Sequence, residues 1–312
     1  MPVRHEKRTT FRELVAGEQI FAPCIWDVFS ARAAERTGYK ATLLSGGALG
    51  YSLAGVPDIG LLNAEELIWA TQRIADASAL PMVVDADDGY SETAIGVYRT
   101  CRRLAKAGAM GITLDDTTGV RGYERWGADF RAGVAAGKVD GNIPHPMVPR
   151  EAWLSKIKAA MDAVSDTDCM IIARTESKLG LGFDEAIERT VLARELGAEM
   201  TLIIGLKSLD ECRRVAEADR GWKMYPDVAS VNGVPDVELA DIEPLGFNFV
   251  TMHYLEKAAI HGMLEYGARV IRDRNTVYAD DHDLGDLTPQ DIRDTEHGEQ
   301  PWLDWEREWN RA

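Results

Sequence analysis

The chain has 312 residues, of which 46% are hydrophobic and 28% charged, and its formal net charge at pH 7 is −16. This composition is typical of a globular protein with a large core and one or two domains. The negative charge argues against nucleic acid or an anionic membrane as partner, but a small anionic substrate stays compatible, because a bound cation and a few arginines reverse the local potential.

Neither a membrane span nor a secretory signal is evident in the sequence. The apolar runs are shorter than the roughly 20 residues that a span needs, and the first residues, Met-Pro-Val-Arg-His-Glu-Lys-Arg, contain no apolar segment. We therefore expect a cytoplasmic protein without membrane contact. Four cysteines, Cys24, Cys101, Cys169 and Cys212, lie far apart without paired spacing. This pattern predicts reduced thiols, and neither a disulfide framework nor a zinc site.

Short apolar runs alternate with stretches of helical periodicity along most of the chain. The runs predict eight strands, at residues 20–25, 41–44, 82–87, 111–114, 169–173, 201–204, 223–225 and 247–253. Helices are expected from 27 to about 38, at 64–77, after a cap at Ser91, and at 150–164, 183–196, 209–218 and 254–272. Eight strands, each followed by a helix or a loop, predict an α/β protein with a (β/α)₈ barrel.

Two segments depart from this alternation. Residues 117–148 are polar, rich in glycine and without periodicity, as functional lids or disordered loops usually are. No boundary is evident before about residue 273, so we expect a barrel with an N-terminal helix at 1–272 and an acidic helical tail at 273–312. In the tail, Trp302, Trp305 and Trp309 recur at spacings of three and four, which favours packing against a neighbouring element or subunit over ligand binding.

An acidic segment follows the third predicted strand. Met82 to Val84 is too short for a helix and too apolar for a surface loop, which indicates a buried parallel strand. Asp85 and Asp87, two residues apart, would then point the same way. Crowded carboxylates repel one another and are stabilised by a hard cation such as Mg²⁺. Alternatively, Asp87 and Asp88 are turn or capping residues, and this segment alone does not decide between the two.

In a barrel of this kind the active site lies at the carboxyl ends of the strands. The residues at those positions are polar or conformationally permissive: Asp27, Ser45, Gly46, Gly47, Asp85, Asp87, Asp115, Asp116, Arg174, Gly205, Asp227 and His253. Because almost every strand ends in such a residue, the sequence favours an enzyme.

Each of these candidates has a structural alternative. Residues 45–47 form either an ordinary turn or a set of backbone N–H groups that approach a substrate carboxylate. Arg174 either pairs with Glu176 or a core aspartate, or grips a substrate carboxylate through two parallel hydrogen bonds. His253 is either a core histidine or a substrate contact and proton donor.

Four motifs, in this order and spacing, resemble the phosphoenolpyruvate mutase/isocitrate lyase superfamily over residues 21–253. They are Trp26-Asp27-Val28-Phe29-Ser30-Ala31-Arg32, Ser45-Gly46-Gly47 with Gly55-Val56-Pro57-Asp58, Asp85-Ala86-Asp87-Asp88-Gly89-Tyr90, and Ile171-Ile172-Ala173-Arg174-Thr175. The resemblance implies a modified (β/α)₈ barrel, Mg²⁺ or Mn²⁺, and bond cleavage or rearrangement next to the carboxylate of an α-oxyacid. It also implies a homotetramer, a dimer of dimers, in which the last barrel helix swaps between subunits.

The resemblance also implies roles for individual residues. The metal site would consist of Asp85, Asp87 and Asp115, with Asp85 holding the ion while Asp58, Asp87 and Asp115 order its waters. The substrate would be bound by Trp26, Ser45, Gly46, Gly47, Arg174 and His253. The catalytic residues would be Asp58, Arg174, His253 and Tyr123.

Departures from the family pattern indicate a branch. Lyases of this family that act on isocitrate, 2-methylisocitrate or dimethylmalate carry a Lys-(Lys/Arg)-Cys-Gly-His motif, and this chain has Tyr123 at the cysteine position. Ile204 and Gly205 stand where those lyases place a glutamate. The oxaloacetate decarboxylase branch similarly lacks the loop cysteine and the glutamate after the sixth strand. It also has a histidine after the eighth strand, as His253 here, and resembles this chain in Leu287-Thr288 and in the aromatic tail. It differs in having a glutamate where this chain has Asp115.

The leading expectation is therefore Mg²⁺-dependent decarboxylation of oxaloacetate or a similar 2-oxo acid, through an enolate that the metal stabilises. The alternatives are a lyase of the 2-methylisocitrate or dimethylmalate type, with Tyr123 as the acid, and an enzyme acting on phosphonopyruvate. A barrel that only binds or scaffolds is disfavoured, because Asp85, Asp87 and Arg174 are all present.

Overall fold

A computed structural model describes residues 9–118, 147–228, 230–231, 234–282 and 299–311. Within the chain, contacts define two compact units, Met1–Tyr254 and Leu255–Ala312. The first unit contains the barrel. The predicted division after residue 272 instead assigns the helix that follows the last strand to the barrel. That assignment, drawn from the absence of an earlier boundary in the sequence, stays a prediction.

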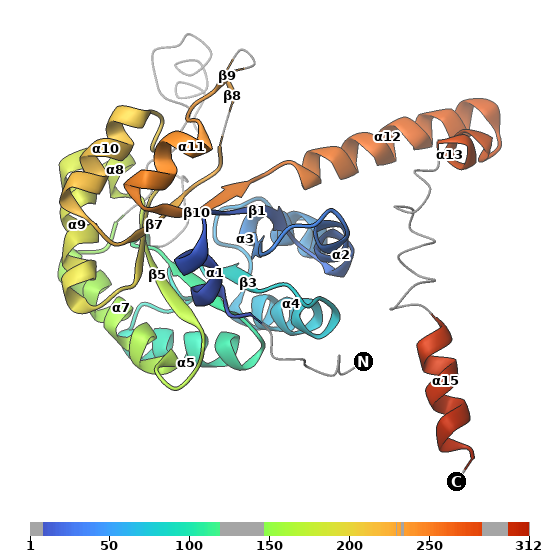
Figure 1. Cartoon of the computed structure of the whole chain (residues 1–312), viewed down its shortest axis with the longest axis horizontal. Coiled ribbons are helices and arrows are strands. Elements are labelled where there is room, and N and C mark those ends of the chain that lie inside the picture. The colour runs from blue at the N-terminus through green and yellow to red at the C-terminus, as the bar shows by residue number, and fades with distance from the viewer. Residues whose placement is uncertain (1–8, 119–146, 229, 232–233, 283–298, 312) are drawn as a thin grey trace. The chain divides into compact units, whose positions relative to one another are not determined.

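Eight parallel strands close into a barrel, as the sequence predicts (Figure 1). The strands are β1 (Ile20–Ile25), β2 (Thr42–Leu44), β3 (Met82–Asp85), β4 (Gly111–Leu114), β5 (Met170–Thr175), β6 (Met200–Ile203), β7 (Trp222–Tyr225) and β10 (Phe247–Met252). Each strand pairs with its neighbour in the chain, and β10 pairs with β1 to close the ring. A small antiparallel pair, β8 (Ser230–Val231) and β9 (Val234–Pro235), follows β7.

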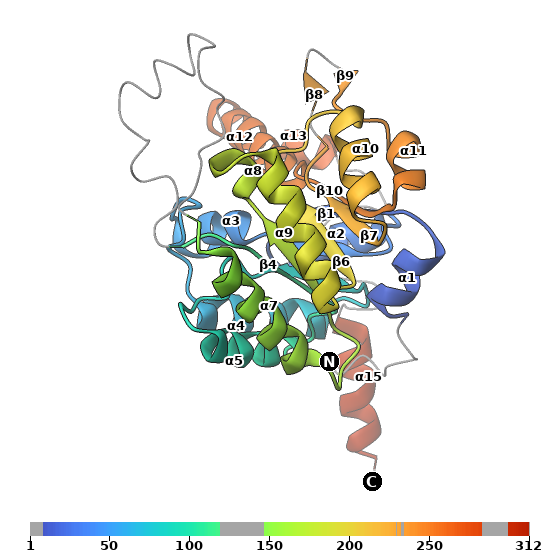
Figure 2. The same ribbon diagram turned by 90° about the vertical axis from the view of Figure 1, so that its left-hand side faces the viewer.

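Helices surround the barrel between consecutive strands (Figure 2). The longer ones are α2 (Val28–Arg36), α4 (Ala64–Ala77), α5 (Ala94–Lys106), α7 (Arg150–Val164), α9 (Phe183–Leu196) and α10 (Leu209–Ala218). Short helical segments are α3 (Gly46–Leu49), the π-helical turn Gly50–Ala54, α8 (Ser177–Gly180), α11 (Leu239–Ile242) and the 3₁₀ turn Glu243–Leu245. These helices cover the outer face of the sheet, so both faces of the strands are buried, as parallel sheets require.

One predicted helix start is wrong. Thr93, and not Ser91, caps α5, because the Thr93 side chain accepts a hydrogen bond from the Gly96 N–H at 3.3 Å. The Ser91 hydroxyl instead accepts from the Thr93 N–H at 3.2 Å. A serine that bonds the backbone two residues on forms a turn, and this turn precedes the helix.

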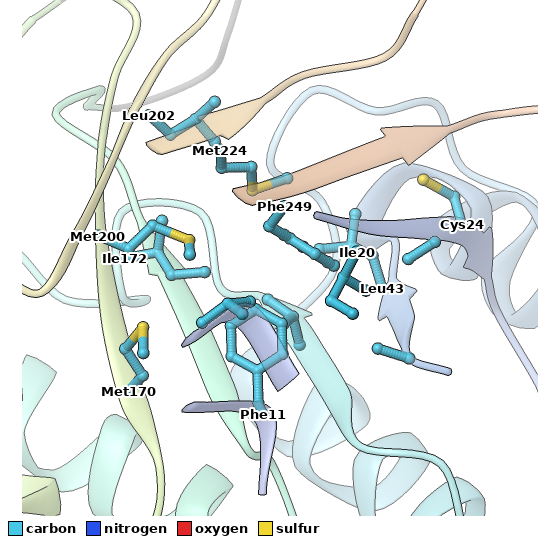
Figure 3. Close-up of a cluster of buried hydrophobic side chains, with 14 residues drawn as sticks. Phe11, Ile20, Cys24, Leu43, Met170, Ile172, Met200, Leu202, Met224 and Phe249 are labelled. Atoms are coloured by element: carbon cyan, nitrogen blue, oxygen red, sulfur yellow. The ribbon is translucent and has the colours of Figure 1, made fainter. Parts of the chain in front are cut away.

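The barrel interior is apolar over most of its length (Figure 3). Inward side chains come from alternate strand positions, as the two-residue period of a strand dictates. Helix α1 (Phe11–Gly17) covers the amino-terminal end: Phe11 is fully buried, and its ring lies edge-on to Phe249 with centroids 4.9 Å apart. Because this end is closed by hydrophobic side chains, chemistry is confined to the carboxyl end.

The second unit consists of helices α12 (Leu255–Asp273), α13 (Val277–Asp281) and α15 (Glu299–Trp309). No side chain of α12 is buried within the chain, and Ile260, Met263, Leu264 and Ile271 are exposed. The three tail tryptophans lie on α15, with ring centroids of Trp305 5.8 Å from Trp302 and 6.1 Å from Trp309. No described helix is both long and apolar enough to cross a membrane.

Candidate active site

A cavity of about 330 Å³ opens at the carboxyl ends of the strands. Its polar lining includes Ser45, Asp58, Asp85, Arg174, Asp227 and His253, which follow or end five different strands. Its apolar lining comes mainly from the ends of β6 and β7. Six side chains predicted from strand ends or from the resemblance therefore meet at one place.

Arg174 on β5 links two of the acidic residues. Its guanidinium donates to Asp85 Oδ1 at 2.7 Å and also pairs with Glu176. The Thr113 hydroxyl donates to the same Asp85 oxygen at 2.9 Å, because β3 and β4 pair Asp85 with Thr113. Burial alone would lower the pKa of Arg174, but Asp85 and Glu176 raise it well above its usual value. Arg174 therefore stays charged and holds Asp85 toward the cavity.

Asp115 and Asp116 are both fully buried after β4 but differ in their bonding. Asp116 is bonded by the Thr175 hydroxyl, by the Glu176 N–H at 2.8 Å and by Arg189 at 3.2 Å, so it joins the ends of β4 and β5. Asp115 Oδ1 accepts from the N–H and hydroxyl of Thr117 at 2.9 and 2.7 Å. Asp115 Oδ2 is buried and has no hydrogen-bond partner among the described residues. Burial raises the pKa of Asp115 to about 7.

The turn after β3 holds Asp87 in an unusual conformation. Asp87 and Tyr90 have φ of 48° and 56°, a region that residues other than glycine rarely adopt. Three contacts hold the turn. The buried Lys156, 2% exposed, donates to the Asp88 carbonyl at 3.1 Å. The Asp115 N–H donates to the Asp87 carbonyl at 2.7 Å, and the Tyr90 hydroxyl donates to Asp87 Oδ2 at 3.3 Å. The Asp88 carboxylate accepts from the Tyr90 N–H at 2.8 Å, so Asp88 is a turn residue, whereas the Asp87 carboxylate is buried.

The glycine segment after β2 lies against the acidic residues. A Cβ on Gly47 would come within 2.8 Å of Asp58 Oδ2, and one on Gly46 would lie 3.8 Å from Asp87 Oδ2. Gly47 must therefore lack a side chain for Asp58 to approach. The Ser45 hydroxyl caps the short helix α3, accepting from the Ala48 N–H at 3.2 Å.

His253 lies at the cavity wall and is not a core histidine, because its side chain is 36% exposed. Its Nδ1 lies 2.5 Å from Asp227 Oδ1 and 3.5 Å from Cys24 Sγ, and its Nε2 lies 3.3 Å from Ser45 Oγ. Asp227 therefore orients the ring, and Nε2 is directed to the Ser45 side of the cavity.

Several predicted residues lie elsewhere or are not described. Trp26 is half-buried after β1 and does not line the cavity, so its role in substrate binding stays a prediction. Asp27 caps α2, accepting from the Ser30 N–H at 2.7 Å. Gly205 lines the cavity with φ of 84°, and its carbonyl accepts from Lys178. Tyr123 lies outside the described residues.

Sequence reasoning assigned no site role to Tyr90, Lys156 or Cys24, and it did not pair Asp227 with His253. Cys24 had a usable signal, since it has the same strand parity as the inward-facing Ile20 and Ala22. Lys156 had none, because its site contact is made from the middle of α7.

These features fit a hard divalent cation. Asp85 borders the cavity, Asp87 is held beside it, and Asp115 presents a buried carboxylate oxygen without a hydrogen-bond partner in the described chain. Magnesium prefers oxygen ligands, and carboxylates are its usual protein ligands. A closed parallel barrel with carboxylates and an arginine at its open end defines a (β/α)₈ barrel enzyme.

Comparison with known proteins identifies the family. Residues 11–271 match the family described as phosphoenolpyruvate phosphomutase, and the chain belongs to the phosphoenolpyruvate mutase/isocitrate lyase superfamily. It is 35% identical to 2-methylisocitrate lyase of Escherichia coli (strain K12), over 79% of this chain and 77% of that protein. It is 31% identical to oxaloacetate decarboxylase of Rhodopseudomonas palustris (strain ATCC BAA-98 / CGA009), over 77% and 75%.

The fold comparison agrees. A crystal structure of 2,3-dimethylmalate lyase superposes with a TM-score of 0.77, covering 96% of this chain and 99% of that one, at 23% identity. The predicted family, fold and enzyme class are confirmed: the protein is an enzyme of a superfamily of carbon–carbon lyases and decarboxylases that act on small carboxylic acids.

Proposed function

We propose that the protein is a Mg²⁺- or Mn²⁺-dependent carboxy-lyase that decarboxylates oxaloacetate or a similar 2-oxo acid. The observation that carries the proposal is the cavity wall after β6, where Ile204 and Gly205 stand and no carboxylate does. Lyases of the family that release a carbonyl product place a glutamate there. A decarboxylase requires no general base, because the bond that breaks releases CO₂ directly.

The acidic side of the cavity would bind the metal and the substrate's reacting end. Asp85, Asp87 and Asp115 would hold the ion, with Asp58 ordering its waters. When bound, Mg²⁺ supplies positive charge that stabilises the negative charge developing on the 2-oxo oxygen. Arg174 donates to Asp85 Oδ1 at 2.7 Å, and with the 45–47 segment it would bind the 1-carboxylate.

The other side would complete the reaction with a proton. After CO₂ leaves, the electron pair of the broken bond resides on the enolate, which must be protonated at carbon. His253 is the proton donor in this proposal, with Asp227 at 2.5 Å fixing its orientation. Because the side chain is 36% exposed, solvent can reprotonate it before the next turnover.

The test is release of CO₂ and pyruvate from oxaloacetate with added Mg²⁺. Asp85→Ala should reduce the rate to that of Mg²⁺ in buffer. Asp210→Ala serves as matched control, because its side chain is 88% exposed on α10 and lies outside the cavity lining. Wild-type turnover no faster than the buffer reaction would end the proposal.

A second candidate is a lyase acting on a substituted malate or a 2-methylisocitrate-like acid, with Tyr123 as the acid. The 35% identity to 2-methylisocitrate lyase favours it. Release of pyruvate or glyoxylate from such acids, lost in Tyr123→Phe, would establish this activity in place of decarboxylation. An assay for phosphorus products from phosphonopyruvate separates the third alternative.

We also propose a homotetramer, in which α12 packs on another subunit. The apolar residues Ile260, Met263, Leu264 and Ile271 recur at helical spacing on α12, and each is exposed within the single chain. Sedimentation should give the mass of a tetramer, and Met263→Glu with Leu264→Glu should give smaller species.

A further inference from the structure

We propose that Cys24, Asp227 and His253 form a second cation site, selective for thiophilic divalent ions such as Zn²⁺. Cys24 lies inside the barrel on β1, one residue before that strand ends, Asp227 follows β7 and His253 follows β10. Their ligand atoms all lie within 4.8 Å of one another. Thiolate, imidazole and carboxylate are the three side-chain ligand types of zinc in proteins.

The distances are close to those of a tetrahedral site. Zinc bond lengths place neighbouring ligand atoms about 3.3 to 3.6 Å apart in a tetrahedron. Cys24 Sγ and His253 Nδ1 are 3.5 Å apart, which already fits. The Asp227 oxygen lies 2.5 Å from Nδ1 and 4.0 Å from Sγ, so it would have to move by about 1 Å or less. Its side chain is 48% exposed, so that movement meets little steric resistance.

The site differs chemically from the proposed magnesium site in the same cavity. Asp85, Asp87 and Asp115 offer only oxygen, which suits Mg²⁺, whereas sulfur and nitrogen ligands suit Zn²⁺. Asp227 and His253 line the cavity, so the fourth position can be taken by water or by a substrate oxygen. Cysteine spacing along the chain predicted no zinc site, since the three ligands come from different strands and meet only when the barrel closes.

Occupation of this site would inhibit the enzyme, a consequence that rests on the proposed function. An ion bound to His253 Nδ1 replaces the hydrogen bond between that atom and Asp227, so the imidazole no longer takes part in proton transfer. The enzyme would then require Mg²⁺ at one position and lose activity when Zn²⁺ fills the other. Excess Mg²⁺ would not restore activity, because it competes poorly for a thiolate.

The binding test uses Co²⁺, because a thiolate ligand gives cobalt a charge-transfer absorption in the near ultraviolet. The protein is kept reduced and saturated with Mg²⁺, and Co²⁺ is added to one equivalent. We expect the band in the wild type and in Asp85→Ala, and its loss in Cys24→Ser. The control is Cys212→Ser, since Cys212 is an equally buried cysteine on α10.

The control should keep the band, and circular dichroism should verify that each variant is folded. A band that persists in Cys24→Ser, or no band in the wild type, overturns the proposal. If Cys24→Ser does not fold, Asp227→Ala and His253→Ala replace it. Each of these variants should weaken cobalt binding, so that the thiolate band appears only at higher Co²⁺ concentrations. Unchanged cobalt binding in both variants would overturn the proposed site.

The second measurement separates this inference from the proposed function. Zn²⁺ titrated into a decarboxylation assay at saturating Mg²⁺ should inhibit the wild type, and Cys24→Ser should be less sensitive relative to its own rate without Zn²⁺. A cobalt band without any decarboxylation would leave the cation site standing and refute the proposed function. Decarboxylation that Zn²⁺ does not inhibit, at concentrations of Zn²⁺ that abolish the cobalt band, would refute the inhibitory role.

Discussion

Buried charges occur at both ends of the barrel, but they are satisfied to different degrees. At the amino-terminal end, the Asp219 carboxylate accepts from Arg194 at 2.8 and 3.1 Å, from Thr201 at 2.6 Å and from the Gly221 N–H at 3.0 Å. Lys223 beside it donates to the carbonyls of Asp219 and Gly221 at 2.7 and 2.6 Å. This network has partners for every carboxylate oxygen and holds the loop between α10 and β7.

At the carboxyl end, the corresponding network is incomplete. Asp115 Oδ2 and Arg174 Nε are buried without a hydrogen-bond partner in the described chain. Two residues other than glycine have positive φ in the turn after β3. Unsatisfied buried groups and local strain cost stability, and folded proteins keep them mainly at functional sites. The comparison predicts that mutations at one end change stability and those at the other change ligand binding.

The largest effect on stability is expected at the amino-terminal end. Asp219→Ala removes the acceptor of Arg194 Nε and of the Thr201 hydroxyl and should lower the free energy of unfolding by about 3 kcal/mol. In a protein of this size that corresponds to a melting temperature lower by roughly 5 °C. Thermal unfolding followed by circular dichroism measures it. Calorimetric titration should show unchanged Mg²⁺ affinity, and weakened Mg²⁺ binding would contradict the division of roles.

At the carboxyl end, Mg²⁺ itself should stabilise the fold. An ion present at 100 times its dissociation constant adds about 2.7 kcal/mol, which would raise the melting temperature by roughly 4 °C. Asp85→Ala should abolish this increase, whereas Asp219→Asn should keep it, starting from a lower baseline. An equal increase in Asp85→Ala would place the ion elsewhere.

The two ends should also respond to pH in opposite directions when the metal is removed. Burial alone would raise the pKa of Asp219, but bonds from Arg194 and Thr201 hold it below its usual value. Its contribution to stability is therefore present at neutral pH and lost as the pH falls through the lowered folded pKa. Asp115 has a folded pKa raised to about 7, so its contribution is present below its unfolded pKa and lost as the pH rises to about 7.

Urea unfolding in a chelator, from about pH 2 to about pH 8, tests this contrast, because the Asp219 loss falls below its ordinary pKa. Relative to the wild type, Asp115→Asn should remove a fall in stability toward neutral pH. Asp219→Asn should remove a fall at the acid end. Identical pH profiles for Asp115→Asn and wild type would show that Asp115 is already ionised in the metal-free protein.

The barrel was predictable from the sequence because each strand and helix carries a local pattern. Apolar runs such as Ile171 to Ala173 fix a strand whatever its neighbours are, and parallel strands with helical connections leave few topologies. The rule that sites follow strand ends then placed Asp85 and Arg174 correctly beside one cavity.

The site features that the sequence did not predict depend on contacts between segments distant in the chain. The Asp227–His253 pair joins residues 26 positions apart, and strand ends alone do not say which side chains turn toward each other. The predicted start of α5 was wrong for a local reason. Ser91 and Thr93 both have side chains that can cap a helix, and only the geometry of the turn determines which of them does. The proposed packing of α12 on another subunit would depend on contacts between chains, which no local pattern in the sequence encodes.

The smallest predicted effect concerns the strained turn at the carboxyl end. The Tyr90 hydroxyl donates to Asp87 Oδ2 at 3.3 Å, and the residue is half-buried. Tyr90→Phe removes that bond and keeps the ring, so stability should change by about 1 kcal/mol or less. Mg²⁺ affinity should fall by about tenfold, because outer partners of metal ligands orient them. Tyr98→Phe on the exposed face of α5 is the control, and an equal loss of affinity in both variants would show that the hydroxyl does not orient Asp87.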